Sequence, residues 1–344
     1  MRIAELVKEH PLKFLVSIVV SLALVYYSFK DLAWEPFWQA LLSINYWILA
    51  GGGFVLVFSN LVRAARWKIL LSPQKKISTK YLYEATMMGY MGNNVLPFKL
   101  GEVLRAVVVA KRHHLKFSGV GASIVVERGL DMFSFLILAG LYGALVPSFE
   151  SARLLSLLGL GALFMVIILG FWVNRHHEKF NTRIETWSQN LVEKGHPKRA
   201  EHLVSIFKGL ETIWHMPKPI QVIIQTGFLW LLYFLVTFMG LAAFDFGLGW
   251  VELWKVSSVL LVFTTLSLSI PAAPGYVGTY HGAVLAALLI FNIDNDAARA
   301  FAIVLHLMNY LIYTPIGAWY LMKAGLTLDL AKSHESVTDL KILK

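Results

Sequence analysis

The sequence predicts an all-α, polytopic membrane protein, on three observations. Hydrophobic residues make up 57% of the chain and charged residues only 15%, a balance outside that of soluble domains. Apolar runs of about 20 residues recur, the length that a helix needs to cross the hydrocarbon core. Lys and Arg gather in separate clusters between these runs. We therefore expect about seven spanning helices plus two broken or re-entrant helical hairpins, arranged as an inverted repeat.

The spanning helices are assigned to the apolar runs in chain order. They cover residues 14–29, 46–61, 118–146, 154–173, 220–243, 253–270 and 298–321. The first run follows Arg2, Lys8 and Lys13, as in a secretory signal, but no small-residue cleavage site follows it. We expect it to remain as a membrane anchor. The runs also lack the alternating pattern of barrel strands, so helices are expected to do the crossing.

The positions of Lys and Arg predict the orientation. They cluster in residues 2–13, 63–80, 99–116 and 175–218, and from residue 323 onward. The positive-inside rule places every cluster, and with them both termini, in the cytoplasm. Successive spans then cross the membrane in alternating directions only under two conditions. Residues 81–110 must enter from the cytoplasm and return to it, and residues 253–291 must begin and end outside. These clusters explain the net charge of +10, and no nucleic-acid partner is expected.

Each of these two hairpins contains a helix-breaking segment. The first break has N-N-V-L-P at 93–97, and the second has P-A-A-P-G at 271–275. Paired breaks that enter from opposite faces are typical of inverted-repeat transporters, whose binding sites lie at the breaks; the alternative is two ordinary Pro kinks in unrelated helices. Exposed backbone must be satisfied inside the membrane, so we expect the two breaks to meet. The expected contacts join Asn93, Asn94 and Pro97 to Pro274, Gly275 and Gly278.

Polar and charged residues surround the first break. Ionisable groups inside a membrane cost roughly 2.5–3.5 kcal/mol each, so each needs a partner or a wet cavity. The positive end of the half-helix after the break can hold an anion, and a lipid phosphate is the candidate. The residues assigned here to substrate binding are Asn93, Asn94, Pro97, Lys99, Glu102 and Arg105.

A second charged group lies in the run 118–146. Glu127 and Asp131 are one helical turn apart, and Arg128 can reach Asp131 at i, i+3. Two stacked carboxylates repel each other unless a cation lies nearby, and we expect Arg128, or Lys99 or Arg105 from the first hairpin, to supply it. Glu127, Arg128 and Asp131 are assigned to substrate binding. A purely structural ion-pair network is the alternative.

The second break and the last helix supply uncharged polar groups. Small residues at the break let backbone approach a ligand, and residues 306, 309, 310 and 313 form one polar helical face. A lone histidine in a membrane helix is more often a packing residue, but either His281 or His306 could carry a proton. The residues assigned here to substrate binding are Pro274, Gly275, Gly278, Tyr280, His281, His306 and Asn309.

Several kinds of chemistry are not indicated. The chain has no cysteine, which excludes disulfides, thiolate catalysis and Cys-ligated metals, and it lacks P-loop, zinc-protease and serine-hydrolase motifs. We expect no cofactor, no metal and no enzymatic activity. Residues 1–330 are expected to form one transmembrane domain that contains a cytoplasmic amphipathic loop at 174–219. Residues 331–344 are expected to form a short cytoplasmic tail.

Three motifs together resemble a known family. N-N-V-L-P-F-K-L-G-E at 93–102, E-R-G-L-D at 127–131 and P-A-A-P-G-Y-V-G-T-Y-H at 271–281 are similar to the flippase-like membrane region of lysylphosphatidylglycerol synthases. The resemblance implies lipid translocation by a stand-alone member that lacks the aminoacyltransferase domain of fused members. Lys99 stands where the family leads us to expect arginine. It keeps the charge but loses the bidentate fork.

The function expected from sequence is therefore transport of a phospholipid or related anionic lipid between leaflets. The partners would be membrane lipids, either anionic phospholipid or polyprenyl-linked lipid, and a homo-oligomer is compatible with the sequence. The membrane would be the cytoplasmic membrane of a bacterium or archaeon. Two alternatives come from other classes. One is a membrane-embedded enzyme that uses Glu127 and Asp131 on lipid head groups, and the other is a non-catalytic partner subunit.

Overall fold

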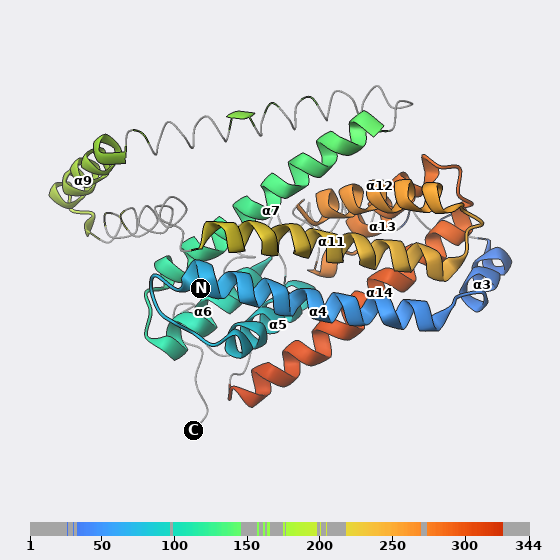
Figure 1. Ribbon diagram of the computed structural model, residues 1–344. Helices are drawn as coiled ribbons and strands as arrows, with labels where there is room; N and C mark the ends of the chain where they lie inside the picture. The colour runs from blue at the N-terminus through green and yellow to red at the C-terminus, as the bar shows by residue number, and fades with distance from the viewer. Residues whose placement is uncertain are drawn as a thin grey trace. The chain divides into compact units, whose positions relative to one another are not determined.

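The chain is helical throughout the part that the structure describes. The computed structural model describes residues 26, 30, 33–96, 99–145, 157, 161, 164, 165, 175, 177–197, 200, 204, 218–269 and 274–325. Within these residues the regular secondary structure consists of helices, and no strand occurs (Figure 1). The predicted all-α class is confirmed.

Four of the described helices are long and apolar enough to cross a membrane. They are α4 (Tyr46–Leu71), α11 (Pro219–Phe244), α12 (Trp250–Ser269) and α14 (Asn295–Lys323). The helix α7 (Phe117–Leu145) has 29 residues, ample length for a span, but Glu127, Arg128 and Asp131 interrupt its apolar sequence. These five helices coincide with five of the predicted spans, and the protein is a polytopic membrane protein.

Two further predicted spans, at 14–29 and 154–173, lie outside the described residues apart from a few isolated positions. The total of seven spans therefore stays a prediction. The predicted cytoplasmic loop contains the helix α9 (His177–Glu193), on which Ile184 is buried and Trp187 is exposed. A short helix, α3 (Trp34–Leu42), precedes α4 and presents Trp34 and Trp38 at its surface, as expected of interfacial aromatic residues.

The helix α4 extends ten residues beyond its predicted end at residue 61. Residues 63–80 were predicted to form a cytoplasmic basic cluster, and that location stays a prediction, but Arg63 and Arg66 do not lie in a loop. Both arginines lie on α4, and their side chains are almost fully buried. The physical reason is that each is neutralised by carboxylates of another helix, as described below.

The first predicted break separates α5 (Thr79–Val95) from α6 (Leu100–His113). Asn93 and Asn94 were expected inside the break but form the last turn of α5. The helix ends two residues before Pro97, because proline disfavours the helical conformation of the residue that precedes it. Pro97 itself lies outside the described residues. After the break, Lys99 has a left-handed backbone with φ of 56°.

The helices α5 and α6 pack closely through glycines. A Cβ atom placed on Gly101 would overlap with the carbonyl oxygen of Gly89, and one on Gly92 would lie 2.8 Å from the Cα of Gly101. Small residues of this kind let two membrane helices approach at backbone distance. The break therefore leads into a tight helical pair.

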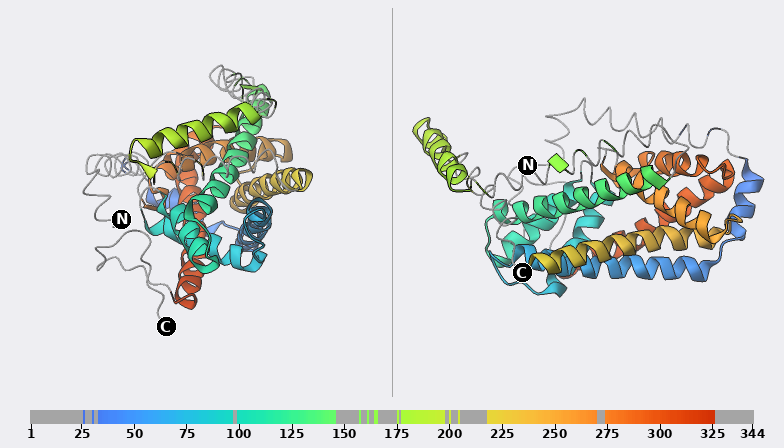
Figure 2. Two further views of the ribbon diagram at one scale, coloured as in Figure 1. Left: turned by 90° about the vertical axis from the view of Figure 1, so that its left-hand side faces the viewer. Right: turned by 45° about the horizontal axis from the view of Figure 1, so that its top comes forward.

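The second predicted break is a short 3-10 turn, η1 (Pro274–Tyr276), followed by α13 (Thr279–Leu289). Two residues of this turn have positive φ, Gly275 at 68° and Tyr276 at 59°, and so has Gly278 at 88°, directly before α13. Residues 270–273 lie outside the described part of the chain. The helix α13 packs against both α12 and α14 (Figures 1 and 2), so the turn is held within a cluster of three helices.

The chain divides into two compact units, and each is described by itself. We call Met1–Val62, Tyr83–Val108 and Leu231–Lys344 the break unit, because it contains both helix breaks. Arg63–Leu82 and Val109–Trp230 form the charge unit, which contains the buried arginines and the carboxylates of α7. The expectation of one transmembrane domain over residues 1–330 stays a prediction.

Candidate functional site

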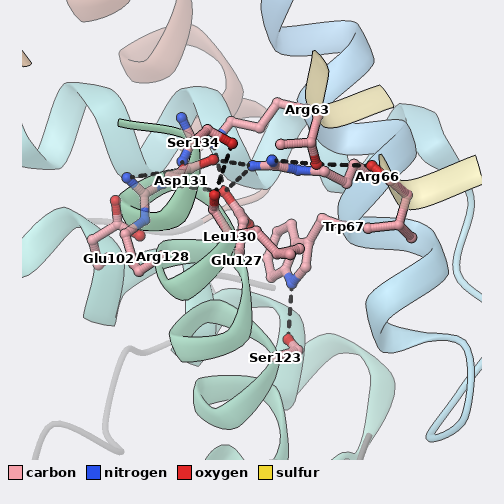
Figure 3. Close-up of polar contacts among 12 residues, drawn as sticks. Arg63, Arg66, Trp67, Glu102, Ser123, Glu127, Arg128, Leu130, Asp131 and Ser134 are labelled. Carbon is pink, nitrogen blue, oxygen red and sulfur yellow. Dashed lines mark hydrogen bonds and ion pairs between the residues drawn. The ribbon is translucent and has the colours of Figure 1, made fainter. Parts of the chain in front are cut away.

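The charge unit contains a buried network of ion pairs. Glu127 and Asp131 lie on one face of α7, and the Glu127 side chain is completely buried. Both carboxylates receive charge-assisted hydrogen bonds from arginines on α4 (Figure 3). Such bonds are about twice as strong as neutral ones, so they link α4 firmly to α7.

Each of the two arginines contacts both carboxylates. Arg63 Nε lies 2.6 Å from Glu127 Oε1, and Arg63 Nη2 lies 3.0 Å from Asp131 Oδ2. Arg66 Nη2 lies 2.6 Å from Asp131 Oδ1 and 3.8 Å from Glu127 Oε1. Arg66 Nη1 also donates a 3.1 Å hydrogen bond to Thr226 Oγ1 on α11. The network therefore joins three of the helices.

Arg128 lies at the more accessible side of this network. Its Nη2 is 3.1 Å from Glu127 Oε1, and its Nη1 is 3.6 Å from Asp131 Oδ2. The side chain is 44% exposed, whereas those of Arg63 and Arg66 are at most 5% exposed. The expectation that Arg128 would serve the two carboxylates is confirmed. The principal partners, however, are Arg63 and Arg66, which sequence reasoning missed.

Arg105, the other cation proposed for those carboxylates, pairs within its own helix. Its Nη2 lies 2.6 Å from Glu102 Oε2, and its Nε donates to the same oxygen at 2.8 Å. Both residues belong to α6 in the break unit. Asn93 is also buried there, and its Oδ1 lies 2.6 Å from the position that a Cβ on Gly101 would occupy. These three predicted site residues thus support the tight pairing of α5 and α6.

The polar face of α14 contacts both helix breaks. His306 Nε2 lies 2.6 Å from the carbonyl oxygen of Gly275 in the second break. One turn further along, the Tyr310 hydroxyl donates a 2.7 Å hydrogen bond to the carbonyl oxygen of Asn94, at the end of α5. Thr314 Oγ1 accepts a 3.0 Å hydrogen bond from Asn94 Nδ2. One face of one helix therefore holds the ends of both breaks.

The two breaks also touch each other. A Cβ atom on Gly275 would lie 3.4 Å from the carbonyl oxygen of Asn94 and 2.6 Å from the ring of Tyr310. Only a glycine fits between these groups, and its φ of 68° also suits glycine. The structure thus places Asn94 beside Gly275, as the topological argument predicted. Gly278 follows in the same turn, and Lys99 Nζ lies 6.0 Å from the ring centroid of Tyr276.

Aromatic and imidazole rings surround the second break. Tyr280 stacks on His306 with centroids 5.1 Å apart, and His281 lies 4.8 Å from His306 at an interplanar angle of 86°. Gly278 N–H donates to His281 Nδ1 at 3.3 Å. Tyr280 and His281 are both buried. The assigned residues of the second break therefore gather on α14.

The polar face of the last helix differs from its prediction at residues 309 and 313. Asn309 was expected on the polar face, but its Nδ2 donates to the carbonyl oxygen of Leu305 on the same helix. Tyr313 contacts other partners: it accepts a hydrogen bond from Asn60 and stacks on Tyr90 at 4.5 Å. The face that serves the breaks consists of residues 306, 310 and 314, at successive i+4 positions.

The predicted site residues thus form two clusters, one in each unit. The cluster of the charge unit is ionic and that of the break unit is mostly neutral. The prediction that the charges of α7 flank the joined breaks concerns both units and stays a prediction. Among the described residues, no group of three or more His, Asp or Glu side chains could hold a metal ion.

Comparison with known proteins identifies the family. The family model for the transmembrane region of lysylphosphatidylglycerol synthase matches residues 14–317. A curated relative, a UPF0104 membrane protein of Methanothermobacter thermautotrophicus, is 22% identical over 268 residues, which cover 73% of this chain and 78% of the relative. No solved structure matches significantly. Since the family model matches most of its length, the chain belongs to the lysylphosphatidylglycerol synthase transmembrane-region family.

Proposed function

We propose that this protein is a lipid transporter that moves a phospholipid or related anionic lipid between the two leaflets of a membrane. The observation that carries the proposal is the contact between the two helix breaks, both of which are held by the polar face of α14. Transporters commonly bind substrate where discontinuous helices meet. The family is tied to lipid handling, which makes a lipid the favoured substrate.

The joined breaks offer groups that suit a polar head group. Helix ends leave backbone N–H and C=O groups without partners inside the helix, and lipid tails cannot satisfy them. Here Tyr310 and His306 satisfy two of these groups, the carbonyl oxygens of Asn94 and Gly275, within otherwise apolar helices. A head group that passes this point could exchange hydrogen bonds with the same atoms.

The charge of the substrate is proposed from Lys99. This side chain is half-buried next to the second break and forms no ion pair with any described residue. A phosphate is a suitable partner for a lysine ammonium group. Lysine binds it as a point charge and without a bidentate fork, so several anionic head groups would be accepted.

The apolar part of the lipid has a groove available in the break unit. A cavity of about 490 Å³ lies between α4 and α14 and is lined by Tyr46, Leu49, Ala50, Gly53, Phe54, Val57, Met308 and Ile312. Met308 and Ile312 lie on α14, the helix whose polar face holds the breaks. We propose that an acyl or polyprenyl chain lies in this groove while the head group crosses.

The cellular setting is also a proposal. The basic clusters of the sequence support a cytoplasmic membrane of a bacterium or archaeon, with both termini in the cytoplasm. The partners would be anionic phospholipids or polyprenyl-linked lipids, and self-association is left to measurement. Site-specific labelling of a cysteine introduced at position 2 or 344 would test the orientation, since this chain has no native cysteine.

Reconstituted vesicles test the proposed transport. Purified protein in phosphatidylcholine vesicles with one tenth phosphatidylglycerol should speed the movement of a fluorescent phosphatidylglycerol between leaflets, measured by dithionite bleaching. Lys99→Gln should slow this movement at least several-fold. Lys76→Gln should not, because Lys76 is exposed and lies in the other unit. Wild-type protein that leaves the rate of empty vesicles unchanged, with phosphatidylglycerol and with a polyprenyl phosphate, contradicts the proposal.

We further propose that the protein leaves its lipid chemically unchanged. The buried Glu127 and the partly buried Asp131 are both paired with arginines, whereas a general acid or base must reach its substrate. Mass spectrometry of the vesicle lipids after the transport assay should show unaltered head groups. A new head group would favour an enzyme instead. Transport that appears only when a second chain is added would favour a partner subunit.

A further inference from the structure

We infer that His306 and His281 form a proton-binding site at the second break, and that one proton moves with each lipid. This inference rests on the proposed function for its transport step. The energy source of transport would then be a proton gradient. His281 and His306, which were assigned to substrate binding, would bind a proton. The argument comes from the hydrogen bonds of the two rings.

The hydrogen bonds fix which nitrogen of each ring carries hydrogen. A carbonyl oxygen can only accept, so His306 Nε2 carries the hydrogen that it shares with Gly275 at 2.6 Å. A backbone N–H can only donate, so His281 Nδ1 accepts from Gly278 and carries none. The remaining site on His306 is Nδ1, which has no hydrogen-bond partner among the described residues.

This arrangement makes His306 the residue that takes the proton. A proton from water that adds to the Nδ1 lone pair gives an imidazolium and leaves the bond to Gly275 in place, strengthened by charge. A proton on His281 Nδ1 would instead displace the bond from Gly278 N–H. The two rings lie 4.8 Å apart, so two cations would repel each other. The pair therefore holds one proton, on His306.

The surroundings of the pair contain uncharged tyrosines and one cation. Besides His281, Tyr280 and Tyr310 contact His306, and the Lys99 ammonium group lies over the ring of Tyr276. The ionisable residues of α12 are Glu252 and Lys255, more than four turns before the break. On α14, Asp296 and Arg299 pair with each other, and Lys323 is the last residue of the helix. The charged residues of the other neighbouring helices are Glu35 on α3, and Lys80 and Glu84 on α5.

The proton would act on the helix that joins the breaks. His306 holds the carbonyl of Gly275, and Tyr310, one turn away, holds that of Asn94. His306 is only partly buried, and the proposed proton site requires that water reach its ring. A charge at His306 also provides a second cation beside Lys99 for an anionic head group. Proton binding and lipid binding at the joined breaks would thus favour each other, as linkage requires.

A titration tests the proton site without any lipid. Protein labelled with 15N-histidine is followed by NMR between pH 5 and 8, and the His306 signals are identified by comparison with His306→Gln. We expect His306 to be the Nε2–H tautomer at high pH and to gain a proton on Nδ1 as the pH falls. A His306 ring that stays neutral over the whole range overturns the proton site.

A pH gradient tests the coupling. Vesicles are clamped at zero membrane potential with potassium and valinomycin, and a gradient of one pH unit is imposed. With one proton per lipid, wild-type protein should establish up to about tenfold asymmetry of labelled phosphatidylglycerol, because one pH unit corresponds to a factor of ten. His306→Gln keeps a donor for Gly275 but has no basic nitrogen, and should therefore establish no asymmetry.

The control is His196→Gln, at an exposed histidine after α9, which should behave as wild type. Wild-type protein that moves lipid but reaches no asymmetry overturns the coupling and leaves the proposed function standing. Wild-type protein that moves no lipid overturns the proposed function, while the titration still decides the proton site. If His306→Gln fails to fold, His281→Gln identifies the signals of the pair by difference.

Discussion

The two units treat buried polar groups in different ways. In the charge unit, carboxylates and guanidinium groups from different helices neutralise each other at distances of 2.6 to 3.8 Å. In the break unit, neutral side chains of α14 bind backbone carbonyls at the ends of interrupted helices. In the charge unit, opposite charges neutralise each other. In the break unit, side chains form the hydrogen bonds that the interrupted helices leave open.

This difference indicates which unit would change during the proposed transport. Breaking one partner of a buried ion pair costs about 3–5 kcal/mol, whereas a neutral hydrogen bond contributes about 0.5–1.5 kcal/mol. The contacts of the break unit can therefore be exchanged for contacts with a lipid at modest cost. We expect the ion pairs of the charge unit to persist through the cycle. The predictions below challenge this contrast, beginning with the largest expected effect.

The largest effect on transport is expected from an arginine of each unit. Arg105→Ala removes the partner of Glu102, and Arg128→Ala removes the accessible cation of the charge unit. Each should lower the transport rate roughly 10-fold to 100-fold, the equivalent of the ~1.5–3 kcal/mol of a charged hydrogen bond. Rates are measured in vesicles and normalised to folded protein. Lys76→Ala, at an exposed position, should match wild type; an equal loss there would contradict the assignment.

A large loss of stability is expected from Glu127→Leu. The change leaves Arg63 and Arg66 facing Asp131 alone in a buried site, and should destabilise the protein by about 3–5 kcal/mol. Thermal unfolding in detergent would show the loss, and Glu185→Leu, exposed on α9, is the control. The double variant Arg63→Leu with Glu127→Leu should recover part of it, because the unpaired charge is gone. Additive losses would mean that the two residues are not coupled.

A smaller loss is expected where α5 meets α6. Gly101→Ala adds a Cβ that overlaps with the carbonyl of Gly89, and forced overpacking costs typically about 1–3 kcal/mol. Gly129→Ala is the matched control, because nothing lies within 4 Å of its Cβ position and alanine favours helix by about 1 kcal/mol. The two variants should therefore shift the unfolding temperature in opposite directions. A shift of the same sign and size for both would refute the tight packing.

Much of the fold could be predicted from sequence because the bilayer imposes length and polarity. The predicted run 220–243 matches α11 within one residue at each end, since few charges interrupt it. The end of α4 was placed too early, because the charges of Arg63 and Arg66 lower the mean hydropathy of the segment after residue 61. Their partners lie more than 60 residues away in sequence, so local polarity could not reveal them. The spacing of Asn60, Arg63 and Arg66 by three residues was the one available signal.

The residue types of the candidate site could be predicted from the sequence, but the contacts among them could not. The two breaks could be located from Pro and Gly, and topology required them to meet. The helix ends could not be located to the residue, because Asn93 and Asn94 are weak helix formers that tertiary contacts keep in α5. Thr314 was missed because its role depends on Asn94 of another helix. Asn309 donates to a carbonyl of its own helix, and its assignment to substrate binding stays a prediction, since polarity alone does not tell a ligand contact from an intrahelical bond.

The smallest effect is expected from a single hydroxyl, and it tests the exchangeable contacts of the break unit most directly. Tyr310→Phe removes the hydrogen bond to the carbonyl of Asn94 and keeps the ring that fits against Gly275. The loss in unfolding free energy should be about 0.5–1.5 kcal/mol.

Tyr46→Phe removes a bond of the same kind, from an exposed hydroxyl to Leu41, where water replaces it. It should cost less unfolding free energy than Tyr310→Phe. Because Tyr310 binds the first break, its variant should also alter the transport rate, whereas a purely structural hydroxyl would change stability alone. Measuring both quantities for both variants therefore separates a contact that is remade during transport from one that only holds the helices together.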